Sequence, residues 1–153
     1  MILFLDFDGV LHPDAAFRTK RGIELRGEGE LFMWSPILEK LLAECPQIKV
    51  VLSTSWVRQL NFRSAKKRLP ESVQDRVIGA TYHSSTESGP DAAPWMERTR
   101  WQQIAGYVAR HKVQDWIALD STMTTPVGRT ISGTGCCTAT RKPGWLDSST
   151  TPP

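Results

Sequence analysis

The chain has little cysteine and no long apolar stretch, and its first residues predict no leader of the secretory type. Its 153 residues include three cysteines, of which Cys45 stands alone and Cys136 and Cys137 are adjacent, so no metal-binding or disulfide spacing emerges. No apolar run approaches the ~18 residues of a membrane-spanning helix, and no basic segment precedes the first apolar residues. We therefore expect a cytoplasmic protein in a reducing compartment, with no membrane partner.

Net charge is also scarce. The chain carries +3 in total, and residues 1–120 carry only +1 of it, which is weak support for a polyanionic partner. Hydrophobic residues at 40% and charged residues at 23% are typical of a globular chain and exclude a mostly disordered one. A chain of this length fits a single domain, and we find no internal repeat.

One compositional break divides the chain. Of the 33 residues from 121 to 153, 21 are Ser, Thr, Gly or Pro, and nothing upstream is similar. We therefore predict a catalytic core over residues 1–120, followed by an atypical tail over 121–153 that is frameshifted or disordered.

Alternating strand and helix patterns fill the first 120 residues. Short apolar runs that end in a polar residue predict the strands 2–7, 48–53, 77–82 and 116–120. Helical periodicity predicts the helices 35–45, 56–69 and 96–112. In the first helix Ser35 is the expected N-cap, and the apolar positions are Ile37, Leu38, Leu41 and Leu42. Residues 9–34 are expected to form a flap or hairpin, and residues 84–94 a loop.

This alternation predicts an α/β fold. Strands joined by helices imply right-handed crossovers and a mostly parallel sheet covered on both faces, a three-layer α/β/α sandwich. Such sheets place their functional sites at the carboxyl ends of the strands.

Paired carboxylates mark the end of the first strand. Asp6 and Asp8 are separated by one residue and followed by Gly9, which permits a tight turn. One carboxylate can lie at a reacting atom while the other residue chelates or donates a proton. Asp and Gly are also ordinary turn residues, so the pair alone does not decide between a site and a turn.

The other strand ends add complementary groups. Ser53 offers a hydroxyl to a phosphate oxygen, and Asp120 offers an oxygen ligand to Mg²⁺. Arg100 begins the helix before the last strand, where a fixed cation can neutralise a phosphoryl group. Each residue alone has a structural explanation as a cap, a turn residue or a solvated charge. Their joint order along one sheet edge favours a phosphate site.

With these residues the chain resembles the haloacid dehalogenase (HAD)-like superfamily, specifically its phosphatases with a minimal cap. The resemblance covers residues 1–120: FLDFDGV is similar to the first motif, VVLSTS to the second, the segment 98–100 to the third and ALD to the start of the fourth. It implies a Rossmannoid core without a substantial cap domain, and hydrolysis of phosphomonoesters.

The resemblance also implies roles for the acids. Asp6 would be the nucleophile that becomes an aspartyl phosphate, and Asp8 the general acid and then base. Mg²⁺, the implied cofactor, would be held by Asp6, the Asp8 carbonyl and Asp120. A metal and a cation offset the repulsion between an anionic nucleophile and an anionic phosphate.

Phosphate-binding residues follow from the second and third motifs. The resemblance implies Ser53, Thr54 and Arg100 for this role. The third motif is the least specific, so Lys66, Lys67 and Arg98 stay open as alternatives for the cation.

The lack of a cap bears on the substrate. An open site favours a large phosphorylated substrate that itself excludes water, a nucleic acid end or a phosphoprotein. Overall the chain is most similar to small bacterial HAD domains associated with RNA repair, which implies a polynucleotide 3′-phosphatase. Two basic groups could follow a phosphate backbone or form a solvated face: Arg18, Lys20, Arg21 and Arg26, and Lys66, Lys67 and Arg68. Three tryptophans could stack on bases or belong to the core: Trp34, Trp56 and Trp101.

The fourth motif departs from the family pattern. A second acid usually follows the position of Asp120, and this chain has Ser121. Codons for Ser121 to Thr124, read two bases on, permit an acidic run there, which is the basis of the frameshift hypothesis. If the tail is native, metal binding weakens, and the alternative is a weakened or inactive HAD-like binding domain. A receiver-like signalling domain is a further alternative, although its phosphoacceptor lies on a later strand.

Overall fold

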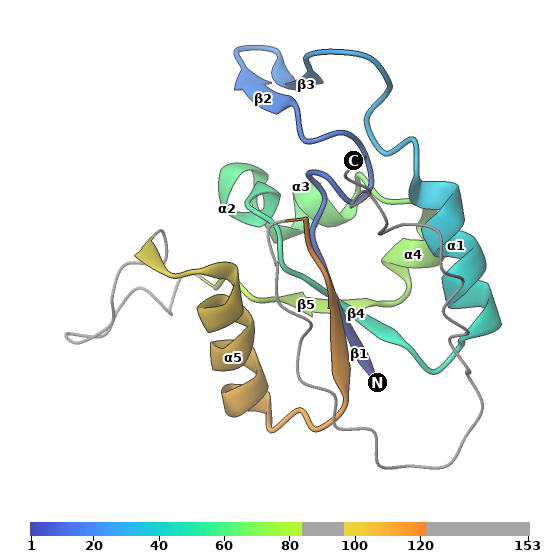
Figure 1. Ribbon diagram of the computed structural model, residues 1–153, viewed down its shortest axis with the longest axis vertical. Helices are drawn as coiled ribbons and strands as arrows, with labels where there is room; N and C mark the ends of the chain where they lie inside the picture. Colours follow the sequence, from blue (N-terminus) through green and yellow to red (C-terminus); the bar gives the residue numbers. More distant parts are fainter. Residues whose placement is uncertain (84–96, 122–153) are drawn as a thin grey trace, which may run out of the picture.

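Four parallel strands form the central sheet of the computed structural model, which describes residues 1–83 and 97–121. They are β1 (Ile2–Leu5), β4 (Lys49–Leu52), β5 (Val77–Ala80) and β6 (Trp116–Leu119), in the order β5-β4-β1-β6 (Figure 1). β1 pairs in parallel with β4 on one side and with β6 on the other. All four predicted strands are confirmed, and so is the mostly parallel α/β sheet.

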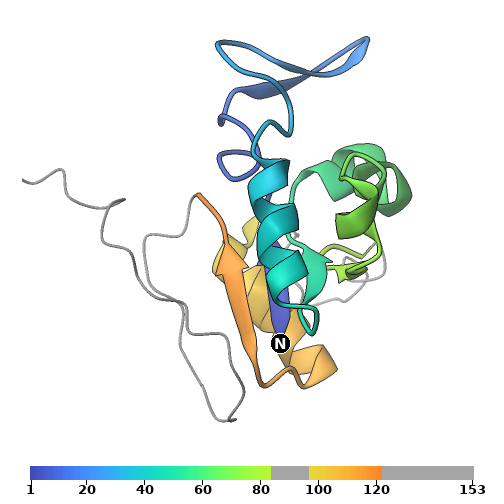
Figure 2. The ribbon, with the colours of Figure 1, turned by 90° about the vertical axis from the view of Figure 1, so that its right-hand side faces the viewer.

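Helices cover both faces of this sheet (Figure 2). The helices are α1 (Ser35–Glu44), α2 (Trp56–Leu60), α3 (Phe62–Lys66), α4 (Glu71–Gln74) and α5 (Arg100–His111). On one face Leu3 and Leu5 of β1 belong to a core that includes residues of α1 to α4. On the other face Phe4 packs with Ile104 and Tyr107 of α5. Alternate residues of β1 therefore point into two separate cores, as the strand's period of two requires.

The helix predicted over 56–69 is interrupted. Asn61 has φ +80°, which no α-helical residue adopts, and it separates α2 from α3. Its side-chain oxygen accepts a hydrogen bond from the Ser64 backbone N–H at 2.9 Å. Asn61 thus ends one short helix and caps the next, a local turn that competes with helical periodicity.

The prediction for α1 is wrong in its N-cap. Its N-cap is Trp34, while Ser35 is the first helical residue and its side chain caps nothing. Leu38 and Leu42 are buried, but Ile37 and Leu41 are exposed. Two of these four apolar side chains of the helix are therefore exposed.

A β-hairpin rises from the carboxyl edge of the sheet, as predicted for residues 9–34. Its strands β2 (Ala16–Thr19) and β3 (Gly22–Leu25) pair with each other and not with the main sheet (Figures 1 and 2). Arg26 lies over the ring of Phe17, with the guanidinium carbon 4.9 Å from the ring centre. Its two strands have four residues each, and no larger inserted domain lies between β1 and α1.

Several expectations lie outside the described residues: the loop at 84–94, the first residue of the helix predicted over 96–112, and the tail beyond Ser121. The described part of that helix, α5, begins later than predicted, at Arg100 after its N-cap Thr99. Within 1–83 and 97–121, no helix has the length and apolar character needed to cross a bilayer.

Candidate active site

Three strand ends converge at the carboxyl edge of the sheet. The Asp6 N–H donates to the Leu119 carbonyl at 3.0 Å, and the Ser53 N–H donates to the Leu5 carbonyl at 2.8 Å. These bonds continue the pairing of β1 with β6 and with β4 by one residue beyond the strand ends. Asp6, Ser53 and Asp120 are therefore brought together, as the sequence predicts.

Arg100 joins the two buried carboxylates of this edge. One guanidinium nitrogen donates to Asp6 Oδ2 at 3.0 Å, and Nε lies 2.8 Å from Asp120 Oδ2. The side chains of Asp6 and Asp120 are only 4% and 2% exposed. Gln103 holds Arg100 in turn, because its side-chain oxygen accepts a hydrogen bond from the other terminal nitrogen of the guanidinium at 3.0 Å. One cation thus faces two acids that have little access to water.

Burial raises the pKa of Asp6 from 3.8 to about 6, because desolvation penalises the charged carboxylate. Arg100 and the Phe7 N–H, which donates to Asp6 Oδ1 at 2.8 Å, lower this pKa but do not offset the burial. Asp120 and Asp8 raise it further. Desolvation is the largest of these influences, so a further cation beside Asp6 would favour its charged form.

Asp8 is held by a different pair of residues. Trp56 Nε1 lies 3.1 Å from Asp8 Oδ1 and 3.0 Å from Oδ2, and His12 Nε2 lies 3.1 Å from Oδ1. The carboxylate is 23% exposed, whereas His12 is fully buried. Asp8 therefore has a fixed orientation and still reaches solvent.

The turn after Asp8 brings His12 back to it. Gly9 has φ +71° and donates its N–H to the His12 carbonyl at 3.0 Å. Ser121 Oγ donates to the Asp8 carbonyl at 3.1 Å and closes the other side of the turn. A Cβ at Gly9 would lie 2.6 Å from both Cβ and Oγ of Ser121, so only glycine fits.

A Gly9→Ala substitution is expected to reduce activity at least tenfold and to destabilise the fold by about 1–2 kcal/mol. The strain arises from the positive φ, and the new methyl group displaces Ser121 and the Asp8 carbonyl. Steady-state kinetics and urea unfolding measure the two effects. Gly22→Ala is the control, because Gly22 also has a positive φ but no atom within 4 Å of the added Cβ. Equal losses of activity in both variants would contradict the role of the Gly9 turn.

The hydroxyls predicted to bind phosphate differ in their surroundings. Ser53 Oγ is buried and has no hydrogen-bond partner among the described residues. Thr54 Oγ1 accepts the Trp56 N–H at 3.3 Å and so helps start α2. Ser53 therefore has the donor that a phosphate oxygen would use, while the Thr54 hydroxyl already has a local role.

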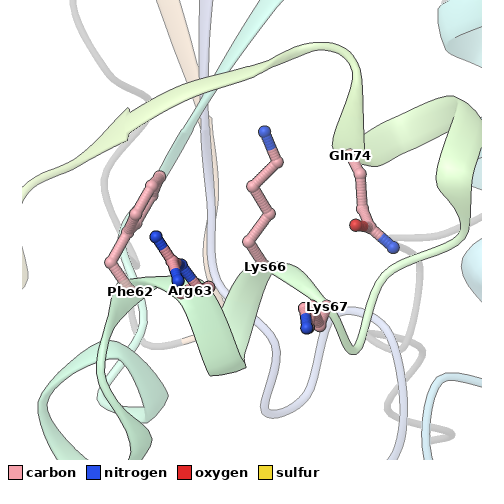
Figure 3. Close-up of a pocket in the computed structure, with 5 residues that line it drawn as sticks. All are labelled: Phe62, Arg63, Lys66, Lys67 and Gln74. Atoms are coloured by element: carbon pink, nitrogen blue, oxygen red, sulfur yellow. The ribbon is translucent and has the colours of Figure 1, made fainter.

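Of the cations that the sequence left open, Arg100 is the one seen to contact Asp6. Lys66 Nζ instead donates to the Val77 carbonyl at 3.3 Å. Lys66 and Lys67 line a separate cavity of about 530 Å³ (Figure 3), whose other lining residues are Phe62, Arg63 and Gln74. The lining of this cavity includes none of the residues to which the resemblance gives a role: Asp6, Asp8, Ser53, Thr54, Arg100 and Asp120.

Sequence reasoning missed two residues that contact Asp8. Trp56 was considered only for base stacking or the core, and at 1% exposure it cannot present its ring to a base. His12 was not singled out, although its spacing of four from Asp8 in a glycine-containing turn is a local signal. Trp101 is 47% exposed and its ring lies 5.8 Å from that of Trp116.

The donor set at the edge suits Mg²⁺. Among residues 1–83 and 97–121, no three His, Cys, Asp or Glu side chains gather as a metal cluster. Two carboxylates and one backbone carbonyl are nevertheless available, and Mg²⁺ accepts few protein oxygens because it keeps several waters. Two acids, Asp6 and Asp120, share the single guanidinium of Arg100. Asp6, Asp120 and the Asp8 carbonyl therefore fit the ion.

A four-strand parallel sheet between helices, with acids after its central strand, is the core of the HAD-like Rossmannoid class. Within that class the chain belongs to the family described as the HAD domain in Swiss Army Knife RNA repair proteins, whose model matches residues 2–138. No curated protein and no solved structure gave a significant match. The family match continues past Asp120, and the boundary proposed there stays a prediction.

Proposed function

We propose that this domain hydrolyses phosphomonoesters through an aspartyl-phosphate intermediate on Asp6. The observation that carries the proposal is the buried Asp6 carboxylate, which accepts a hydrogen bond from Arg100 at 3.0 Å, together with the partly exposed carboxylate of Asp8. A buried nucleophile, a fixed cation and a partly exposed acid are the groups that phosphoryl transfer requires.

The chemistry divides into two displacements. Asp6 Oδ attacks phosphorus, the bond from phosphorus to the ester oxygen breaks, and Asp8 gives its proton to that oxygen as it leaves. Water then attacks the phosphorus of the aspartyl phosphate and loses a proton to Asp8. The bond from phosphorus to Asp6 breaks, inorganic phosphate departs, and both acids return to their starting forms.

The remaining side chains bind and orient the phosphoryl group. Arg100 donates to equatorial oxygens, and the unpartnered Ser53 hydroxyl donates to another. Mg²⁺ on Asp6, Asp120 and the Asp8 carbonyl would neutralise charge that develops on these oxygens. Arg100 faces both carboxylates, so it shares this electrostatic role.

We further propose that the substrate is the 3′-phosphate end of an RNA. The family description names RNA repair proteins. Between β1 and α1 the chain holds only the short hairpin β2–β3, and so small an insertion favours a large substrate. The cavity of Figure 3 is lined by Arg63, Lys66 and Lys67 together with the exposed Phe62, and cations with an aromatic ring are the combination that binds single strands.

The direct test compares RNA oligonucleotides with a 3′-phosphate, a 5′-phosphate or a phosphopeptide, each with Mg²⁺ and with EDTA. The proposal expects Mg²⁺-dependent release of phosphate, fastest from the 3′ end. Equal rates with the phosphopeptide would reject RNA as the substrate class. No turnover of any phosphomonoester, in a folded protein, would favour the alternative of an inactive binding domain. The specific observation behind that alternative is Ser121, which contacts the Asp8 carbonyl where the family places a second acid.

Neutralising the cavity is expected to weaken RNA binding without preventing the chemistry. Arg63→Gln with Lys67→Gln should raise KM for the oligonucleotide about tenfold and flatten its dependence on log salt by roughly 0.7 per lost phosphate contact. KM measured from 50 to 300 mM salt gives both values. Lys40→Gln with Arg110→Gln removes the same charges elsewhere and is the control. An unchanged salt dependence in the cavity variant would remove the cavity from the RNA path.

A further inference from the structure

The two N–H donors on Asp8 come from buried aromatic rings of different segments. Trp56 starts α2 after β4, and His12 ends the turn after β1. Trp56 and His12 are 1% and 0% exposed, while the carboxylate they share is 23% exposed. Water alone can solvate a carboxylate with that exposure. Solvation therefore does not explain why two protein donors also bind it.

Packing leaves neither ring free to turn. The His12 ring centre lies 5.1 Å from that of Phe32 and 5.5 Å from that of Trp56. Trp56 also packs edge-on against Phe7 and Phe32, at 5.6 and 5.3 Å. Rings locked in this way present their N–H groups in one direction.

The hydrogen-bond inventory of His12 assigns its tautomer. Nδ1 is buried and has no partner among the described residues, so a proton there would be an unsatisfied buried donor. The proton therefore belongs on Nε2, 3.1 Å from Asp8 Oδ1. His12 is a donor to Asp8, as Trp56 is.

We infer that Trp56 and His12 are positioning residues, which fix the Asp8 carboxyl group in the orientation needed to protonate the leaving oxygen. This inference rests on the proposed function. Both donors reach Oδ1, and Oδ2 receives only the shared indole N–H. Oδ2 is therefore the oxygen with capacity left to carry the proton, which moves to the ester oxygen as its bond to phosphorus breaks.

The competing explanation is structural: Asp8 would merely satisfy two buried N–H groups. The two explanations differ in their dependence on the leaving group. An alkyl ester, such as the 3′-phosphate of an RNA, needs protonation of the departing oxygen, whereas p-nitrophenolate departs without it. Because kcat/KM reports all steps up to departure of this group, lost acid catalysis lowers it much more for the alkyl ester than for p-nitrophenyl phosphate.

The experiment measures kcat/KM on both substrates for Trp56→Phe and His12→Phe. We expect a fall of about 30-fold or more with the 3′-phosphorylated oligonucleotide and less than threefold with p-nitrophenyl phosphate. His12→Gln retains an N–H donor and should recover much of the loss. Trp116→Phe, which removes an indole at the far end of β6, is the control. Equal falls on both substrates would overturn the positioning role.

An NMR measurement separates this inference from the proposed function. The indole N–H resonance of Trp56, assigned by its disappearance in Trp56→Phe, should shift in Asp8→Ala and remain in place in Asp75→Ala. An unshifted resonance would overturn the positioning role even in an active enzyme. If the resonance shifts in Asp8→Ala but the wild-type protein hydrolyses neither substrate, the proposed function is overturned. The catalytic role of Trp56 and His12 is then overturned with it.

Discussion

Asp6→Asn is expected to abolish phosphate release while making the protein more stable. The amide cannot form an aspartyl phosphate, so turnover should fall by at least ~10³-fold, to the background rate. The same substitution removes a buried charge. Stability and activity should therefore change in opposite directions.

The sign of the stability change follows from the pKa of Asp6, which burial raises from 3.8 to about 6. The folded state prefers the protonated acid, so the stability this preference supplies is complete below pH 3.8 and is lost as pH rises through 6. Asparagine has no charge to desolvate. At pH 8 the variant should gain up to roughly 3 kcal/mol, the equivalent of that shift, and the gain should vanish near pH 4.

Urea unfolding of both proteins in EDTA, from pH 4 to 8, tests this prediction. Asp75→Asn, which removes an exposed acid, is the control and should show no such pH dependence. An Asp6→Asn variant that retains activity would exclude Asp6 as the nucleophile. A variant less stable than the wild type at pH 8 would show that the Arg100 contact outweighs the burial.

Arg100→Gln is expected to cause the largest loss of stability. It leaves Asp6 and Asp120 buried without their common cation, and breaking a buried ion pair costs about 3–5 kcal/mol. It also removes the cation proposed to bind the phosphoryl group, so kcat/KM should fall by ~10²-fold or more. Without Arg100 the pKa of Asp6 rises further, because the main opposing influence is gone.

The destabilisation should therefore depend on pH. It should be greatest at pH 8, which is above the pKa of Asp6, and smaller at pH 5, where Asp6 is protonated. Unfolding in urea at the two pH values measures it, with Arg110→Gln on the same helix as the control. Because the variant can lose its fold at pH 8, the double variant Asp6→Asn with Arg100→Gln provides a second measurement and should be more stable than Arg100→Gln alone. Equal stability of the two arginine variants at both pH values would contradict the buried ion pair.

Strand positions were predictable because each strand is a short apolar run bounded by polar residues. The family resemblance followed from Asp6, Asp8 and their neighbours, and the family match supports it. Helix details were less accessible. The break at Asn61 and the exposure of Ile37 and Leu41 depend on a local turn and on which neighbours pack against α1, and periodicity does not report either.

Part of the site was also readable. That Asp6, Ser53 and Asp120 lie at the same edge of the sheet follows from the parallel direction of their strands alone. The family resemblance favours Arg100 as the cation, but Lys66, Lys67 and Arg98 have similar chemistry in the sequence, so only the structure shows that Arg100 contacts Asp6.

The sequence by itself determined the sheet, the acids at its carboxyl edge and the superfamily that they resemble. These depend on hydrophobic pattern and on residues close together in the chain. Only the tertiary structure decided that Arg100 faces two buried acids and that Trp56, 48 residues from Asp8, donates to it. Such contacts join segments distant in sequence, and their geometry is fixed by packing, which no local pattern encodes.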